Sequence, residues 1–126
     1  MSVGIVDTTV IFHYYRNITQ ARQWVDNQTV RLSVTPLTWL EVMRGASNKS
    51  IQSVSRAILG KFELIYLTPQ DQQWAMQQLE AFHFSHRIGM NDCLIGSVAN
   101  RLQIPLYTHN LKHMTPLLGN LAVKPY

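Results

Sequence analysis

The sequence predicts an α/β domain in which helices flank a mainly parallel sheet of about five strands. Short apolar segments typical of buried strands alternate along the chain with segments of helical periodicity. Two threonine–proline pairs, Thr35-Pro36 and Thr68-Pro69, are typical helix starts. Because 126 residues with 46% hydrophobic content make the size of one domain, we expect residues 1–126 to form a single domain with one core.

The first half of the chain supplies two expected strands and four expected helices. Residues 2–6 are apolar and are followed by Asp7-Thr8-Thr9, which suits a buried strand that delivers Asp7 at its carboxyl end. The other expected elements are a brief helix through Phe12, a helix within 17–27, a strand at 29–34, a helix from Pro36 to about Gly45 and a helix from Asn48 to about Leu59.

The second half continues the alternation and adds three strands. A third strand is expected at 62–67, followed by a helix from Pro69 and a polar loop over 83–89. Asn91 or Asp92 begins the next helix, and strands are expected at 104–107 and 121–123. In parallel sheets of this kind, ligands bind beyond the carboxyl ends of the strands.

Composition narrows the class of protein. Eleven Lys and Arg against seven Asp and Glu give a formal charge of +4, which favours an anionic partner such as nucleic acid or an acidic protein. The single cysteine, Cys93, excludes an internal disulfide and a zinc site built from thiolates. No long apolar stretch and no signal-peptide pattern are present, so we expect a cytoplasmic protein without a membrane segment.

Three of the seven acids are the candidate chemical groups. Asp7 follows the first strand and Asp92 opens a late helix, although each side chain can also act only as a helix N-cap. Glu41 lies at the edge of the buried stripe of its helix, although it can instead pair with Arg44 on a solvated face. Spacing alone leaves both interpretations open.

A polar segment follows the fourth expected strand. Thr108-His109-Asn110 comes directly after it, and His113 lies three residues beyond Asn110. Because Asn is a frequent turn residue, the segment is also compatible with an ordinary turn.

Four segments in order resemble the PIN-domain family, and within it the VapC-type toxins. They are IVDTTVIFHYYR, TPLTWLEVMRG, GMNDCLIGSVANRLQIPLYTHNLKHM and the closing VKPY, and together they span nearly the whole chain. The resemblance implies a PIN-like three-layer α/β/α sandwich and a Mg²⁺- or Mn²⁺-dependent ribonuclease. It also implies a role as the toxin of a type II toxin–antitoxin pair, a homodimer and a cognate antitoxin partner.

Residue by residue, the resemblance implies that Asp7 and Asp92 are the metal ligands. Glu41 completes the acidic pocket or positions the attacking water, and Thr108 and Asn110 shape the floor of the pocket. Asn110 and His113 occupy positions where the family often has a further acid, so a fourth carboxylate is missing. Since two close cations need several carboxylates, one firmly held metal ion is expected.

Substrate contacts are expected from cationic and aromatic residues around the crevice. We place Arg87, beside His86, above the others, and His113 is a candidate contact to the substrate or leaving group. The other candidates are Tyr14, Tyr15, Arg16, Arg44 and Lys112.

Two alternatives stand beside the nuclease. A non-catalytic PIN-like module would bind RNA or protein without cleavage if the missing acid abolishes useful metal affinity. A phosphate-accepting regulatory domain also uses acids at strand ends, but it needs a pair of acids after the first strand, and Asp7 is followed by Thr8-Thr9.

Overall fold

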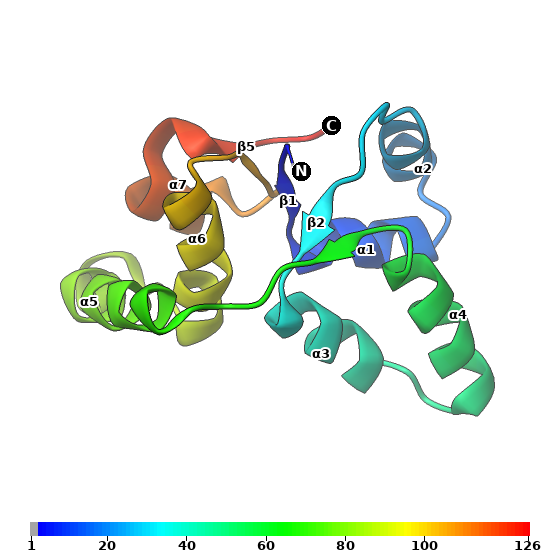
Figure 1. The fold of residues 1–126 in the computed structure, drawn as a ribbon, viewed down its shortest axis with the longest axis horizontal. Coiled ribbons are helices and arrows are strands. Elements are labelled where there is room, and N and C mark those ends of the chain that lie inside the picture. The colour runs from blue at the N-terminus through cyan, green and yellow to red at the C-terminus, as the bar shows by residue number, and fades with distance from the viewer. Residues whose placement is uncertain (1–2) are drawn as a thin grey trace.

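The computed structural model describes residues 3–126 and places a parallel five-stranded sheet between two layers of helices (Figure 1). The strand order is β3-β2-β1-β4-β5, and every neighbouring pair is parallel. This confirms the expected α/β class and the three-layer architecture. The strands are β1 (Ile5–Val6), β2 (Ser33–Val34), β3 (Glu63–Leu64), β4 (Leu106–Tyr107) and β5 (Ala122–Val123).

Seven α-helices connect or follow these strands within residues 3–126. Local capping explains where several of them begin: Thr35 caps α3, Asn48 caps α4, and Thr68 forms a reciprocal capping box with Asp71 at α5. The helices are α1 (Thr8–Tyr15), α2 (Thr19–Asp26), α3 (Pro36–Arg44), α4 (Lys49–Leu59), α5 (Pro69–His86), α6 (Met90–Leu102) and α7 (Leu111–Leu118), and a short 3₁₀ helix covers Gly119–Leu121.

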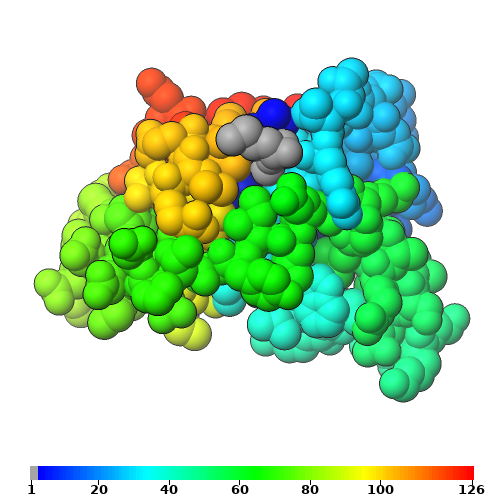
Figure 2. All heavy atoms as spheres, in the orientation of Figure 1, coloured from blue at the N-terminus to red at the C-terminus, as the bar shows by residue number. Residues whose placement is uncertain are grey.

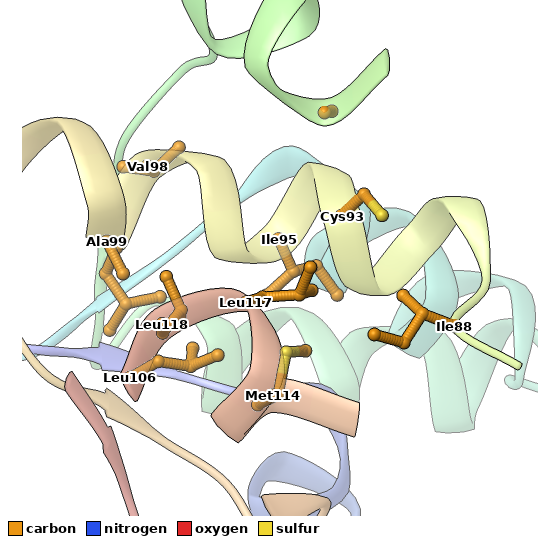
Figure 3. Close-up of a cluster of buried hydrophobic side chains, with 11 residues drawn as sticks. Ile88, Cys93, Ile95, Val98, Ala99, Leu106, Met114, Leu117 and Leu118 are labelled. Carbon is orange, nitrogen blue, oxygen red and sulfur yellow. The ribbon is translucent and has the colours of Figure 1, made fainter. Parts of the chain in front are cut away.

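The sheet separates two hydrophobic cores because successive strand residues point to opposite faces. Ile5 belongs to the core shared with α5, α6 and α7, whereas Val6 belongs to the core shared with α1 and α4, and both side chains are fully buried. Figure 3 shows the first core, in which side chains of α6 and α7, such as Ile95 and Leu117, meet above Leu106 of β4. Central strand β1 is therefore buried on both faces.

The segment that leaves β3 for α5 crosses the middle of the molecule. Figure 1 shows it as a ribbon running from the sheet to α5, and Figure 2 shows its atoms covering the centre of the same face. In that view the crossover links the side of the molecule that holds α3 and α4 to the side that holds α5, α6 and α7. None of the helices in the described part of the chain has the length and apolar character needed to cross a membrane.

Several expected boundaries differ from the structure. Ser2 lies outside the described residues, and each strand pairs over only two residues, so the apolar segments extend beyond the hydrogen-bonded ladders. Helix α1 continues to Tyr15 rather than ending at Phe12, and α5 continues to His86, which shortens the expected 83–89 loop to 87–89.

The C-terminal third holds two further corrections. Helix α6 begins at Met90 behind Gly89, so Asp92 lies within its first turn instead of opening the helix. Helix α7 was not predicted, because it is short and contains Pro116. Its buried residues Met114, Leu117 and Leu118 complete the core under α6.

Candidate active site

Asp7 and Thr108 lie side by side at the carboxyl edge of the sheet. Strands β1 and β4 are parallel neighbours with Val6 opposite Tyr107, so the residues that follow them emerge together. The Thr108 hydroxyl donates to Asp7 Oδ2 at 2.7 Å, and the Thr8 backbone N–H donates to Asp7 Oδ1 at 2.8 Å. Asp7 is 8% exposed, so both carboxylate oxygens are held in place in a largely desolvated position.

Glu41 reaches the same region from α3. The Thr8 hydroxyl donates to Glu41 Oε1 at 3.0 Å and lies 2.9 Å from the Thr38 hydroxyl. Because a hydroxyl carries a single hydrogen, Thr8 accepts from Thr38 when it donates to Glu41. Thr38 is fully buried, so this chain of hydrogen bonds anchors Glu41 to the core of the domain.

The electrostatics of Asp7 reflect its acidic neighbours. Burial raises the pKa of the Asp7 carboxyl above its ordinary value of 3.8, and the hydrogen bonds from Thr108 and Thr8 lower it. The negative charges of Asp92 and Glu41 raise the pKa of Asp7 further. Asp92 of α6 and Glu41 of α3 therefore lie close enough to Asp7, at the end of β1, for their charges to act on it.

Asp92 is linked to the polar segment after β4 through His113. His113 Nδ1 lies 3.2 Å from Asp92 Oδ2 and 3.2 Å from the side-chain nitrogen of Asn110. An Nδ1–H that donates to Asp92 leaves no lone pair on that nitrogen for Asn110. The Asn110 backbone N–H donates to the Thr108 hydroxyl at 2.9 Å, which connects the Asp92 side of the site to Asp7.

The structure decides among several of the open interpretations. Asp7 does cap α1, and the same carboxylate lies in the acidic cluster, so capping and a chemical role are compatible. Asp92 is not the cap of α6. Glu41 and Arg44, both described in the structure, form no ion pair, and Glu41 accepts from Thr8 instead.

The expected substrate-contact residues fall into separate places. Arg87, Lys112 and His113 line one cleft of about 420 Å³ together with Phe84, Ser85 and His86. Tyr14 was a wrong prediction, because it is 2% exposed and its hydroxyl donates to Asp26.

Two further expected contacts lie elsewhere. Tyr15 and Arg16 line a different pocket, between α1 and α4. Thr108 is fully buried, so it is placed to orient Asp7, and a direct contact of its side chain with substrate is not supported.

Comparison with known proteins identifies the family. A family model described as the PIN domain matches residues 4–113. The chain belongs to the PIN-domain family. The expected family membership is thereby confirmed, and a comparison with curated proteins finds no match.

Solved structures share the fold of this PIN domain at low sequence identity. A toxin–antitoxin complex from Klebsiella pneumoniae is similar with a TM-score of 0.76 and 22% identity, covering 98% of both chains. The structure of VapBC-1 from nontypeable Haemophilus influenzae is similar with a TM-score of 0.74 and 20% sequence identity, covering 93% of this chain and 92% of that chain. The structure of DNA-bound VapBC from Salmonella typhimurium is similar with a TM-score of 0.76 and 21% sequence identity, covering 94% of this chain and 95% of that chain.

The donor set of this PIN domain suits a hard divalent cation. Within residues 3–126, no group of three or more His, Cys, Asp or Glu side chains is arranged so that together they could hold a metal ion. Mg²⁺ is nonetheless commonly bound by one or two carboxylates, with water and substrate phosphate completing its shell. A buried Asp7 whose ionised form is disfavoured by two neighbouring acids is a group that a cation would stabilise, so the residues fit such an ion.

Two site residues were missed by the sequence analysis. Thr8 was read only as the absence of a second acid, and Thr38 was not singled out. Their hydroxyls meet across 30 residues and connect to Glu41 across 33 residues from Thr8. No local spacing signals such contacts, because they depend on how α3 packs against α1.

Proposed function

We propose that this PIN domain is a metal-dependent endoribonuclease that hydrolyses RNA phosphodiesters and acts as a VapC-like toxin of a type II toxin–antitoxin pair. The observation that carries the proposal is that the charges of Asp92 and Glu41 raise the pKa of Asp7, whose carboxylate is held by hydrogen bonds from Thr8 and Thr108. Neighbouring acids repel a phosphodiester unless positive charge is present between them and the phosphate.

In this proposal Asp7 and Asp92 hold a Mg²⁺ or Mn²⁺ ion. When bound, such an ion supplies positive charge for the scissile phosphate and activates a water for in-line attack. Asp7 and Asp92 bind through hard oxygen donors, and Thr108 keeps Asp7 Oδ2 in position for that role. Glu41, oriented by the Thr8 hydroxyl, completes the acidic pocket or removes a proton from the attacking water.

Asn110 and His113 support the Asp92 side of the pocket. His113 donates from Nδ1 to Asp92 in the tautomer that forms this hydrogen bond, and Asn110 lies beside the same nitrogen. With its other ring nitrogen, His113 is a candidate contact to the substrate or leaving group. Asn110 fixes the Thr108 hydroxyl through its backbone N–H.

The test of the catalytic proposal is a cleavage assay on purified protein with and without Mg²⁺ or Mn²⁺. Wild-type protein should cleave RNA only with the ion, and Asp7→Asn or Asp92→Asn should abolish cleavage. Full activity in the Asp7→Asn variant, or equal activity with chelator present, would refute the assignment. Glu80→Gln, an exposed acid on α5, is the matched control and should keep wild-type activity.

A non-catalytic module that binds RNA or protein is the second candidate. It is favoured by Asn110 and His113 standing where the family often has an acid, and by the absence of a closed three-residue metal site within residues 3–126. This candidate predicts RNA binding that is unchanged by metal and no cleavage under any ionic condition.

An antitoxin partner is supported by the solved structures of similar fold, which are described as toxin–antitoxin and VapBC complexes. The formal charge of +4 suits an acidic protein segment. We propose that a small protein encoded beside this chain binds it and suppresses cleavage. Co-expression of the neighbouring reading frame, followed by co-purification and the cleavage assay, tests this proposal. A cytoplasmic location stays a prediction.

A homodimer is proposed from an exposed apolar face. Met76 and Met90 are 72% and 67% exposed, and both line an apolar groove of about 410 Å³ between α5 and α6. A second copy can bury such a face symmetrically, because a two-fold interface uses the same surface on both subunits. Light scattering should give the dimer mass, and Met76→Lys with Met90→Lys should give the monomer.

A further inference from the structure

The cleft beside the acidic pocket contains unpaired cations. Arg87 and Lys112 line it, and within residues 3–126 neither side chain forms an ion pair or a side-chain hydrogen bond. Two arginines elsewhere are occupied by contrast: Arg101 pairs with Asp71, and Arg31 donates to two backbone carbonyls. Arg87 and Lys112 are therefore available to an external anion.

The composition of the cleft selects for negative charge. Its lining residues are Phe84, Ser85, His86, Arg87, Lys112 and His113, and none of them is an acid. The acidic pocket next to it has the opposite charge. A ligand that reaches both the cleft and the acidic pocket therefore needs two anionic groups. A cation would hold one of them against the acids, and Arg87 and Lys112 would bind the other directly.

His113 joins the cleft to the acidic pocket. Its Nδ1 lies 3.2 Å from Asp92 Oδ2, and the same side chain forms part of the cleft wall. Lys112 precedes it on α7, and Arg87 lies in the turn between α5 and the start of α6, the helix that carries Asp92. When the scissile phosphate of an RNA strand lies next to Asp92, the neighbouring nucleotide of that strand therefore lies beside this cleft.

The shape and one wall of the cleft suit an unpaired nucleotide. Its volume of about 420 Å³ lies within the roughly 300–1,000 Å³ range of small-ligand pockets. Phe84 is 93% exposed, so its ring is open to stacking by a base. A base held in a duplex keeps its stacking neighbours and cannot enter such a pocket, whereas unpaired bases in single strands and loops can.

Resting on the proposed ribonuclease function, we infer that this cleft binds the nucleotide adjoining the scissile phosphate. Arg87 and Lys112 bind its phosphate, and Phe84 stacks on its base. The cleft is a specificity site, distinct from the acids that hold the metal.

The test measures RNA binding in an Asp7→Asn background, where the strand stays intact. Fluorescence anisotropy with a short labelled oligoribonucleotide compares Arg87→Ala/Lys112→Ala with Lys49→Ala/Arg56→Ala, which removes the same charges from exposed positions on α4. Loss of this phosphate contact should lower the slope of log affinity against log salt by about 0.7, since each phosphate neutralised on a single strand contributes about 0.7. The control pair should leave the slope near its starting value.

A second comparison tests the base contact. Phe84→Leu should weaken binding of the single-stranded oligonucleotide about five-fold or more, while leaving binding of the same sequence in a duplex unchanged. Equal salt slopes in the two double variants, or equal losses for single strand and duplex, would overturn the inference. These binding measurements do not depend on cleavage. If the wild-type protein cleaves RNA but the cleft variants bind RNA normally, only the inference about the cleft fails. If the cleft variants lose binding but the wild-type protein shows no metal-dependent cleavage, only the proposed nuclease function fails.

Discussion

The hydroxyl of Thr108 donates to Asp7 Oδ2 at 2.7 Å, joining two residues that lie 101 positions apart. Thr108 is fully buried, and its oxygen also accepts from the Asn110 backbone N–H. This hydrogen bond lowers the pKa of Asp7 against the opposing effects of burial and of two neighbouring acids. A residue without any titratable group therefore helps to keep the principal acid ionised.

Thr108→Val should shift the pH dependence of cleavage. Without the hydroxyl, the pKa of Asp7 rises further, so the acidic limb of the rate–pH profile should move to higher pH. The variant should also lose about 1–3 kcal/mol of stability, because buried groups lose their hydrogen-bond partner. Thr108→Ser keeps the hydroxyl and should retain the wild-type profile. An unshifted acidic limb in the valine variant would show that the ionisation of Asp7 does not control the rate of cleavage at low pH.

Asp7→Asn should stabilise the metal-free protein. A carboxyl whose pKa is raised in the fold contributes stability while protonated and loses it as pH rises from 3.8 through the folded pKa, so ionised Asp7 is destabilising at neutral pH. With chelator present, the variant should melt a few degrees above wild type. Added Mg²⁺ or Mn²⁺ should raise the melting temperature of wild type alone. Equal metal-induced shifts in both proteins would place the ion elsewhere.

Thr8→Val should slow catalysis without weakening substrate binding. The substitution removes the hydrogen bond to Glu41 Oε1, while the backbone N–H of residue 8 still donates to Asp7. Because Glu41 is then free to rotate, kcat should fall about ten-fold or more with little change in KM. Thr8→Ser is the control that retains the hydroxyl. Unchanged kcat in the valine variant would mean that the orientation of Glu41 does not limit the reaction.

Local signals in the sequence predicted the helix starts well. Thr35, Asn48 and Thr68 cap their helices through contacts with residues three positions ahead, so the information is contained in a few neighbouring residues. Reliance on local composition also explains why the predicted α5 is shorter than the observed helix, which extends to His86. His83 and His86 are exposed, and a helix surface accepts polar residues that a composition-based interpretation assigns to a loop.

Tertiary packing decided what the sequence could not predict. Strand ends depend on which backbone groups find a partner, and the apolar character of residues such as Val30 continues outside the paired ladder. Helix α7 forms because Leu117 and Leu118 bury against the core under α6, despite Pro116 between α7's two ends. The family resemblance supplied Asp7, Glu41 and Asp92 as candidates, but only packing reveals the threonines that orient them.

Asp71→Ala should destabilise the fold without touching the acidic pocket. Asp71 is 2% exposed, accepts from the Thr68 backbone N–H in the capping box, and receives the Arg101 guanidinium at 3.0 Å on both oxygens. Loss of a cap costs about 1 kcal/mol and loss of a charge-assisted hydrogen bond about 1.5–3 kcal/mol, so we expect a loss of about 2–4 kcal/mol in urea unfolding. Glu80→Ala, exposed on the same helix, should change stability by less than about 0.5 kcal/mol.

His109 should make the stability of the fold depend on pH below neutrality. It packs among His13, Lys124 and Tyr126, with its ring 4.5 Å from that of Tyr126, and its buried Nε2 has no hydrogen-bond partner among the described residues. Partial burial, then the charges of His13 and Lys124, lower the pKa of His109 below its ordinary value of 6.5. As pH falls through 6.5, the unfolded chain takes up a proton that the folded chain refuses, so the free energy of unfolding should decrease.

His109→Phe isolates this contribution, since it keeps an aromatic ring against Tyr126 and removes the titrating nitrogen. Its free energy of unfolding should vary less than that of wild type as pH is lowered from 7 through 6.5, and at pH 7 it should be no less stable, because a buried unpartnered nitrogen is removed. His86→Phe, at an exposed position, is the matched control and should follow the wild-type curve. Parallel curves for wild type and His109→Phe across this range would show that the proton uptake of the unfolded chain has another origin.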